Sequence, residues 1–293
     1  MTWFLAALLA SVFFSGQALI FQQLQKHYPI SVFMTLVRLG SGTLLAFFFL
    51  RPDDIPLLTQ FAPHLILSAF CSWAGTYAYN RAIRAQDNIG YVHAVLGAQT
   101  ALSYGYSLLF LNASFEWLRL GGVITLTAGA LLVSGVLQQS QHVPDEKNAQ
   151  SSVSGVPVWF LWALLAAILF TIMTIFVRYT TDNGVASQDA LAIILLITGV
   201  LFLGGCFQTG QSLSIAAAHR PLLIGAILLA AIGNLLEFFS YENTPNLAYT
   251  IAISNTRMIL LYIIGLWMFS QKVQLLRAAG IALAFIGVMA LSL

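Results

Sequence analysis

The chain has 293 residues, of which 59% are hydrophobic and 8% are charged, whereas an ordinary soluble domain carries roughly 25% charged residues. So few polar side chains could not cover the surface of a water-soluble fold of this length. The net charge of +2 gives no reason to expect a nucleic acid or an acidic protein as a partner. The composition therefore predicts a protein that lies within a lipid bilayer.

Ten apolar segments follow one another along the chain, each about as long as the 20 residues that a helix needs to cross a bilayer. They cover residues 3–23, 32–50, 63–84, 88–110, 118–137, 158–178, 189–207, 221–242, 246–268 and 275–292. Each is predicted to be a transmembrane helix, because a helix satisfies its own backbone hydrogen bonds without water. Cys71 and Cys206 lie inside such segments and are predicted to pack as free thiols.

A polar segment from Gln138 to Pro157 reads as a flexible linker near the middle of the chain. The sequences on its two sides are similar: residues 3–10 and 159–166 agree at seven of eight positions, and residues 63–134 match 221–292 at an offset of 158 without a gap. The matched pairs are Pro63/Pro221, Gly75/Gly233, Asn88/Asn246, Tyr91/Tyr249, Tyr104/Tyr262, Arg119/Arg277, Gly122/Gly280 and Gly129/Gly287. A duplication is therefore predicted.

Each half of the duplication holds five spans. An odd number makes the second copy enter the membrane from the opposite side, as in the inverted repeats of secondary transporters. The predicted fold is an all-α membrane protein of ten transmembrane helices, built from two inverted five-helix repeats at 1–137 and 158–293 with the linker at 138–157. The substrate site is expected where the repeats meet.

This arrangement, with a glycine-bearing helix such as 120–130 closing each half, resembles the drug/metabolite transporter superfamily of the EamA type. The likeness is most specific over residues 79–129 and 237–287. It implies export or exchange of a small metabolite, a site among the third, fourth, eighth and ninth helices, and cytoplasmic termini. Where members of that family often carry a proline in the fourth and ninth helices, this sequence has Leu96 to Gln99 and Ser254 to Arg257.

Three charged residues fall deep inside predicted spans: Arg38, Glu237 and Arg257. An ion at the bilayer centre costs about 2.5–3.5 kcal/mol on insertion scales, which makes each one a functional candidate. Asn234, Glu237 and Tyr241 share one helix face through their spacings of three and four. A substrate with a carboxylate, such as an amino acid, is predicted, with Arg257 on the anion and Glu237 on an amine or a proton. The alternative is a structural ion pair between Glu237 and Arg257, and for Arg38 a structural pairing.

The uncharged candidates form stripes on the third and fourth spans, although aromatic stripes are more often packing than ligand contacts. His93 lies near a predicted helix end, where hydration is expected and a proton relay is the alternative. Asn255 is a site candidate whose alternative is a bond across helices, and the glycines of the fifth and tenth spans are expected to permit close packing. The predicted substrate-binding residues are Trp73, Tyr77, Asn80, Gln99, Tyr104, Asn234, Glu237, Tyr241, Asn255 and Arg257, with Glu237 and His93 as candidates for proton coupling.

An intramembrane enzyme is not predicted, because neither H-E-x-x-H nor G-x-S-x-G occurs in the chain. No cofactor and no metal site is expected. A passive channel remains the alternative to a carrier. The expected partners are a small-molecule substrate and the bilayer of a cell inner membrane, with protons as a candidate coupling ion and the protein as a monomer or homodimer.

Two arguments about the orientation of the chain in the membrane disagree. Cytoplasmic termini, which the resemblance implies, leave seven basic residues outside and three inside, against the positive-inside tendency. The outer set is Lys26, Arg81, Arg84, Lys147, Arg220, Lys272 and Arg277, and the inner set is Arg51, Arg119 and Arg178. We keep cytoplasmic termini as the prediction.

Overall fold

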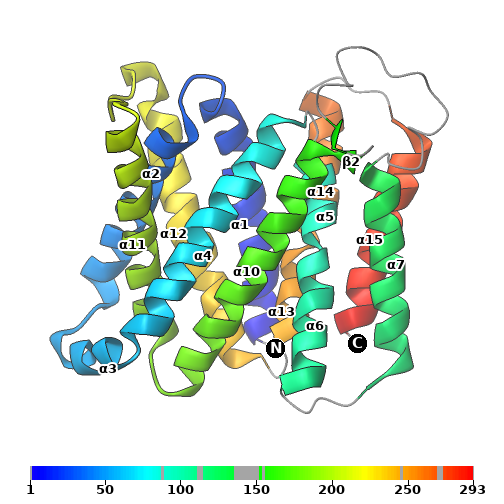
Figure 1. The fold of residues 1–293 in the computed structure, drawn as a ribbon, viewed down its shortest axis with the longest axis horizontal. Coiled ribbons are helices and arrows are strands. Elements are labelled where there is room, and N and C mark those ends of the chain that lie inside the picture. The colour runs from blue at the N-terminus through cyan, green and yellow to red at the C-terminus, as the bar shows by residue number, and fades with distance from the viewer. Residues whose placement is uncertain are drawn as a thin grey trace. The chain divides into compact units, whose positions relative to one another are not determined.

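The computed structural model describes residues 2–86, 89–110, 115–134, 152–153, 156–244, 247–268 and 273–292. Nearly all of this chain is helical (Figure 1). The long helices are α1 (Thr2–Leu24), α2 (Ile30–Phe49), α4 (Ala62–Arg84), α7 (Trp117–Ser134), α10 (Val158–Asp182), α11 (Ser187–Gln208), α12 (Arg220–Asn243) and α15 (Leu275–Ser292). Shorter helices are η1 (Pro52–Asp54), α3 (Ile55–Gln60), α5 (Ile89–Leu96), α6 (Ala98–Phe110), η2 (Ala217–His219), α13 (Leu247–Ser254) and α14 (Arg257–Met268).

Helices occupy all ten segments that the sequence predicts to span a membrane. Among the described residues, six are long and apolar enough to cross a bilayer, or seven if η1 and α3 are joined with α4 across a bend of 82°. Large apolar side chains point outward, as with Phe47, Leu109 and Trp117, each at least 78% exposed. Such surfaces suit contact with lipid. The chain is thus a multi-pass membrane protein, and the count of ten crossings remains a prediction.

The predicted linker lies mostly outside the described residues, as do Asn88 and Asn246 of the repeat alignment. Its described part was not expected to hold regular structure. It contains a hairpin in which β1 (Ser152–Val153) pairs antiparallel with β2 (Val156–Pro157). The hairpin is a small departure from the predicted all-α fold.

The helices divide into two compact units, and each unit takes helices from both halves of the sequence. The first unit comprises residues 1–77 and 169–244, and the second comprises 78–168 and 245–293. The boundaries cut α4 between Tyr77 and Ala78 and α10 between Ile168 and Leu169. The two units are described separately below.

In the first unit, α1 packs on α12, and α2 packs on α11 and α12. Close approach is permitted by glycine: a Cβ on Gly42 would lie 2.9 Å from the Leu196 nitrogen, and one on Gly199 would lie 2.9 Å from the Leu39 nitrogen. The two contacts are equivalent, since 199 − 42 and 196 − 39 both equal 157. The buried core of this unit includes the free thiol of Cys206, and Cys71 is also buried and free, as predicted.

In the second unit, α7 and α15 lie side by side (Figure 1). Gly129 abuts the backbone of Ala284, and Gly287 abuts the backbone of Leu126. These contacts make the two helices antiparallel and confirm the predicted role of the glycines, because small residues let helix backbones approach closely within membranes. Both contacts again join equivalent positions, since 287 − 129 and 284 − 126 both equal 158.

The fourth and ninth predicted helices are interrupted, which the sequence prediction did not include. The first break falls at Gly97, between α5 and α6, and the second at Asn255 and Thr256, between α13 and α14. Residues of these types have low helix propensity. Tighter i to i+3 bonds carry the backbone across, with the Thr100 nitrogen bonded to the Gly97 oxygen at 2.9 Å and the Met258 nitrogen bonded to the Asn255 oxygen at 3.0 Å. Gly97 and Asn255 are matched by the offset of 158.

Candidate functional site

The break between α13 and α14 places a cation inside the second unit. Arg257 is the first residue of α14, and its charge acts on Tyr79 of α4 and on His93 of α5. The Tyr79 hydroxyl and His93 Nε2 are hydrogen-bonded at 2.8 Å. A hydrogen-bonded tyrosine and histidine from α4 and α5 therefore lie within the electrostatic reach of the arginine that begins α14.

His93 is 2% exposed, and every residue of α5 is buried. The expectation that it is hydrated near a helix end is therefore wrong, because α5 packs against α7 and α14 along its length. Among the described residues, its Nδ1 atom has no hydrogen-bond partner. His93 is thus a buried polar group with one nitrogen held by Tyr79 and one left for a further partner.

The two helix breaks are joined by a buried hydrogen bond. Asn255 Nδ2 donates to Thr100 Oγ1 over 3.1 Å, and both residues are at most 1% exposed. The alternative reading of Asn255 as a bond across helices is confirmed. Gln99 and Asn80 are buried in the same unit, at 7% and 0% exposure.

The first unit holds a second group of predicted site residues. Trp73 and Tyr77 pack beside the buried apolar cluster that includes Phe202, whose ring centroid is 6.3 Å from that of Trp73. Arg38 Nη2 donates to Thr76 Oγ1 over 2.9 Å. Arg38 is therefore directed at α4 next to Tyr77, in agreement with the structural pairing considered from the sequence.

Two of the three predicted residues on α12, Asn234 and Tyr241, have different partners. Asn234 Nδ2 donates to the Ala230 carbonyl one turn back at 2.7 Å. The Tyr241 ring is buried with its centroid 5.7 Å from that of Phe238, and its carbonyl accepts from Arg178 Nη1 at 2.5 Å. Glu237 is partly exposed on the same helix. It belongs to the first unit and Arg257 to the second, so their approach remains a prediction.

Tyr104, also predicted as a site residue, lies in a cluster of side chains around Arg119 at the start of α7. Arg119, 7% exposed, donates from Nη2 to the Tyr249 hydroxyl over 2.7 Å and is paired with Glu116 at 3.1 Å. Its guanidinium carbon lies 5.6 Å from the Tyr104 ring centroid and 5.4 Å from that of Tyr249. The cluster joins residues from both halves of the chain.

The start of α15 carries the equivalent cluster in a different state. The guanidinium carbon of Arg277 lies 5.0 Å from the Tyr91 ring centroid, and the Tyr91 and Tyr262 rings are 5.7 Å apart. Within the described chain, the Tyr262 hydroxyl and Arg277 Nε are buried without a hydrogen-bond partner. The position equivalent to Glu116 is Gln274, since 116 + 158 = 274. Sequence reasoning did not propose these clusters, although the repeat alignment already matched Tyr91 with Tyr249 and Arg119 with Arg277.

An all-helical, multi-pass fold with buried polar clusters at interrupted helices defines a membrane protein with a polar interior. The chain belongs to the EamA-like transporter family, which matches residues 1–135 and 157–293. It is therefore a membrane transporter of the drug/metabolite type.

A solved structure titled only as the crystal structure of a protein has the same fold, with a TM-score of 0.74 and 14% identity over 100% of this chain and 98% of that one. No curated protein matches the chain.

Proposed function

We propose that the protein moves a small metabolite with a carboxylate, such as an amino acid, out of the cell by alternating access. The observation that carries the substrate class is Arg257 beside a helix break, with the Tyr79 and His93 pair within reach of its charge. A cation within a membrane span is costly and usually serves an ion or substrate path. Arg257 would bind the anionic group, as guanidinium groups bind carboxylates well.

The two inverted repeats, residues 1–137 and 158–293, are the proposed moving parts. The helix contacts support this, because Gly129 against Ala284 and Gly287 against Leu126 are the same contact at matched positions. The breaks at Gly97 and Asn255 are matched too. Discontinuous helices at corresponding positions of two repeats accompany the substrate sites of several transporter folds.

Alternating access further implies that matched residues differ in their contacts in any one state. The two clusters around Arg119 and Arg277 differ in this way: Arg119 bonds the Tyr249 hydroxyl, whereas Arg277 lies over the face of Tyr91, with no hydrogen bond between those two among the described residues. We interpret the contact between Arg119 and Tyr249 as closed and the equivalent contact between Arg277 and Tyr91 as open. In the opposite state the bond would form between Arg277 and Tyr91.

Counterflow in proteoliposomes tests the carrier mechanism and identifies the cargo. Vesicles loaded with one compound from a panel of amino acids and small carboxylates are supplied with the same compound labelled outside. Acceleration by unlabelled compound supports a carrier, whereas its absence for a compound that does permeate favours a channel. Arg257→Gln should abolish this flux in inserted protein while Arg51→Gln, at an exposed arginine, leaves it intact. Unchanged kinetics in Arg257→Gln would remove Arg257 from the site.

Proton coupling through Glu237 is the proposed alternative to exchange. Glu237→Gln should then remove the pH dependence of flux, and a flat pH profile in the parent protein would end that role. We expect the protein in the inner membrane with cytoplasmic termini, as a monomer or homodimer. Periplasmic activity of a reporter fused after Leu293 would reverse the orientation.

A further inference from the structure

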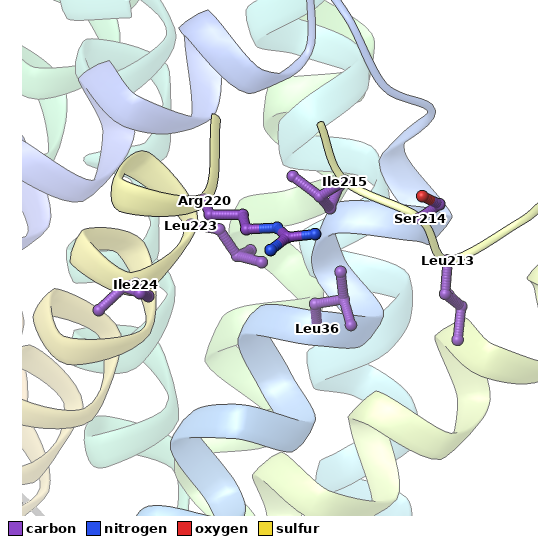
Figure 2. Close-up of a pocket in the computed structure, with 7 residues that line it drawn as sticks. All are labelled: Leu36, Leu213, Ser214, Ile215, Arg220, Leu223 and Ile224. Atoms are coloured by element: carbon purple, nitrogen blue, oxygen red, sulfur yellow. The ribbon is translucent and has the colours of Figure 1, made fainter. Parts of the chain in front are cut away.

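A pocket of about 420 Å³ lies in the first unit, where α2 and α12 begin. Its wall is formed by one residue of α2, three of the segment between α11 and η2, and three of the first turns of α12. These residues are Leu36, Leu213, Ser214, Ile215, Arg220, Leu223 and Ile224 (Figure 2). Five of the seven are leucine or isoleucine, so the pocket is lined mainly by hydrocarbon.

The wall between α11 and α12 is held in place by hydrogen bonds to the start of α2. Ser31 Oγ donates to Gln211 Oε1 at 2.5 Å. The Tyr28 hydroxyl accepts from the Ala216 nitrogen at 3.0 Å and is bonded to His219 Nδ1 at 2.8 Å. These bonds anchor the wall segment near both of its ends.

The inner side of the pocket is continuous with the protein core, because Ile215 is 7% exposed and packs in a buried cluster with Val32 and Cys206. The outer side is open, since Ile224 is 56% exposed on α12. The pocket thus leads from an exposed, apolar helix surface to a buried apolar floor. An extended hydrocarbon chain matches that shape and chemistry.

One charged residue, Arg220, lines the pocket. Arg220 is exposed, and its guanidinium reaches over the pocket toward Ile215 and Leu36 (Figure 2). No lining residue is acidic, and within the described chain the guanidinium has no ion pair. Arg220 lies in the first turn of a candidate membrane span, Ala217–Asn243. That is the depth at which lipid headgroups meet hydrocarbon.

We propose that this pocket binds one anionic phospholipid, with its phosphate on Arg220 and an acyl chain against Leu36, Leu223 and Ile224. Arginine binds phosphate oxygens through paired N–H groups, and basic pockets at the ends of membrane helices bind anionic headgroups. The bilayer supplies this ligand at the right depth. A lipid seated here would link α2, the 211–216 segment and α12.

Native mass spectrometry of the full chain released from detergent tests the proposal. Titration with phosphatidylglycerol should give one tightly bound lipid, and phosphatidylcholine should bind at least tenfold more weakly. Arg220→Gln should weaken phosphatidylglycerol binding at least tenfold, whereas Arg51→Gln removes a different exposed arginine and should leave it unchanged. Equal binding of both lipids, or equal loss in both variants, would overturn the assignment.

A second pair of variants tests the acyl-chain part of the pocket. Ile224→Trp narrows the pocket and should displace the lipid, whereas Ile232→Trp makes the same change two turns along the exposed face of α12 and should not. Retention of the lipid in Ile224→Trp would refute the acyl-chain position. Competition by millimolar inorganic phosphate as effective as that by the lipid would show a free-anion site and refute the lipid. None of these readouts depends on transport.

Discussion

Tyr249→Phe removes one hydroxyl from the cluster around Arg119 at the start of α7 and keeps the ring. Arg119 is nearly buried and donates to this hydroxyl over 2.7 Å. A hydrogen bond to a charged group contributes about 1.5–3 kcal/mol. Because 1.4 kcal/mol changes an equilibrium tenfold, opening of this contact should become about 10- to 150-fold more favourable.

Hydrogen–deuterium exchange of the protein in nanodiscs measures that opening. Amides of 117–124 and 247–254 should exchange at least tenfold faster in Tyr249→Phe than in the parent protein. Tyr91→Phe is the matched control, because Arg277 contacts the ring of Tyr91 and no hydroxyl bond joins them among the described residues. Unchanged exchange in Tyr249→Phe, or an equal increase in the same segments in Tyr91→Phe, would refute the interpretation that the bond between Arg119 and Tyr249 holds this contact closed.

Three further predictions concern packing and polar contacts. Gly129→Ala should destabilise the fold by about 1–3 kcal/mol and so lower its melting temperature, because the added methyl would overlap the Ala284 backbone. Gly121→Ala, with open space around it, should leave the melting temperature unchanged, and equal shifts in the two variants would contradict this. Gln274→Glu should add an ion pair three residues before Arg277 and slow exchange in 275–282 about twofold, and no slowing would exclude the pair. Thr100→Val should lower the free energy of unfolding by about 0.6–2 kcal/mol, because the hydrogen bond from Asn255 is lost. Thermal unfolding measures this change, and Thr125→Val is the control, because the Thr125 hydroxyl bonds the Gly121 carbonyl of its own helix. An equal loss of stability in both variants would show that the bond to Asn255 contributes nothing.

The sequence singled out charged residues more readily than their uncharged neighbours. Arg257 was proposed because a charge in an apolar segment is rare, and in the structure its charge acts on Tyr79 and His93; its role in the site stays a prediction. Tyr79 and Thr76 were missed as hydrogen-bond partners of His93 and Arg38, because a tyrosine or threonine in a membrane helix is ordinary. Their importance appears only once the facing helix is in place.

Crossing length is a local property of about 20 residues, so the apolar segments alone were enough to predict the helices and their membrane setting. The glycines of α7 and α15 could likewise be read as contact points, since close helix approach requires a small residue. The partners of buried side chains depend instead on the rotation and register of one helix against another. The resulting contacts join residues more than 100 positions apart, as with Thr100 and Asn255 or Arg119 and Tyr249. Packing between the two halves of the chain therefore determines them.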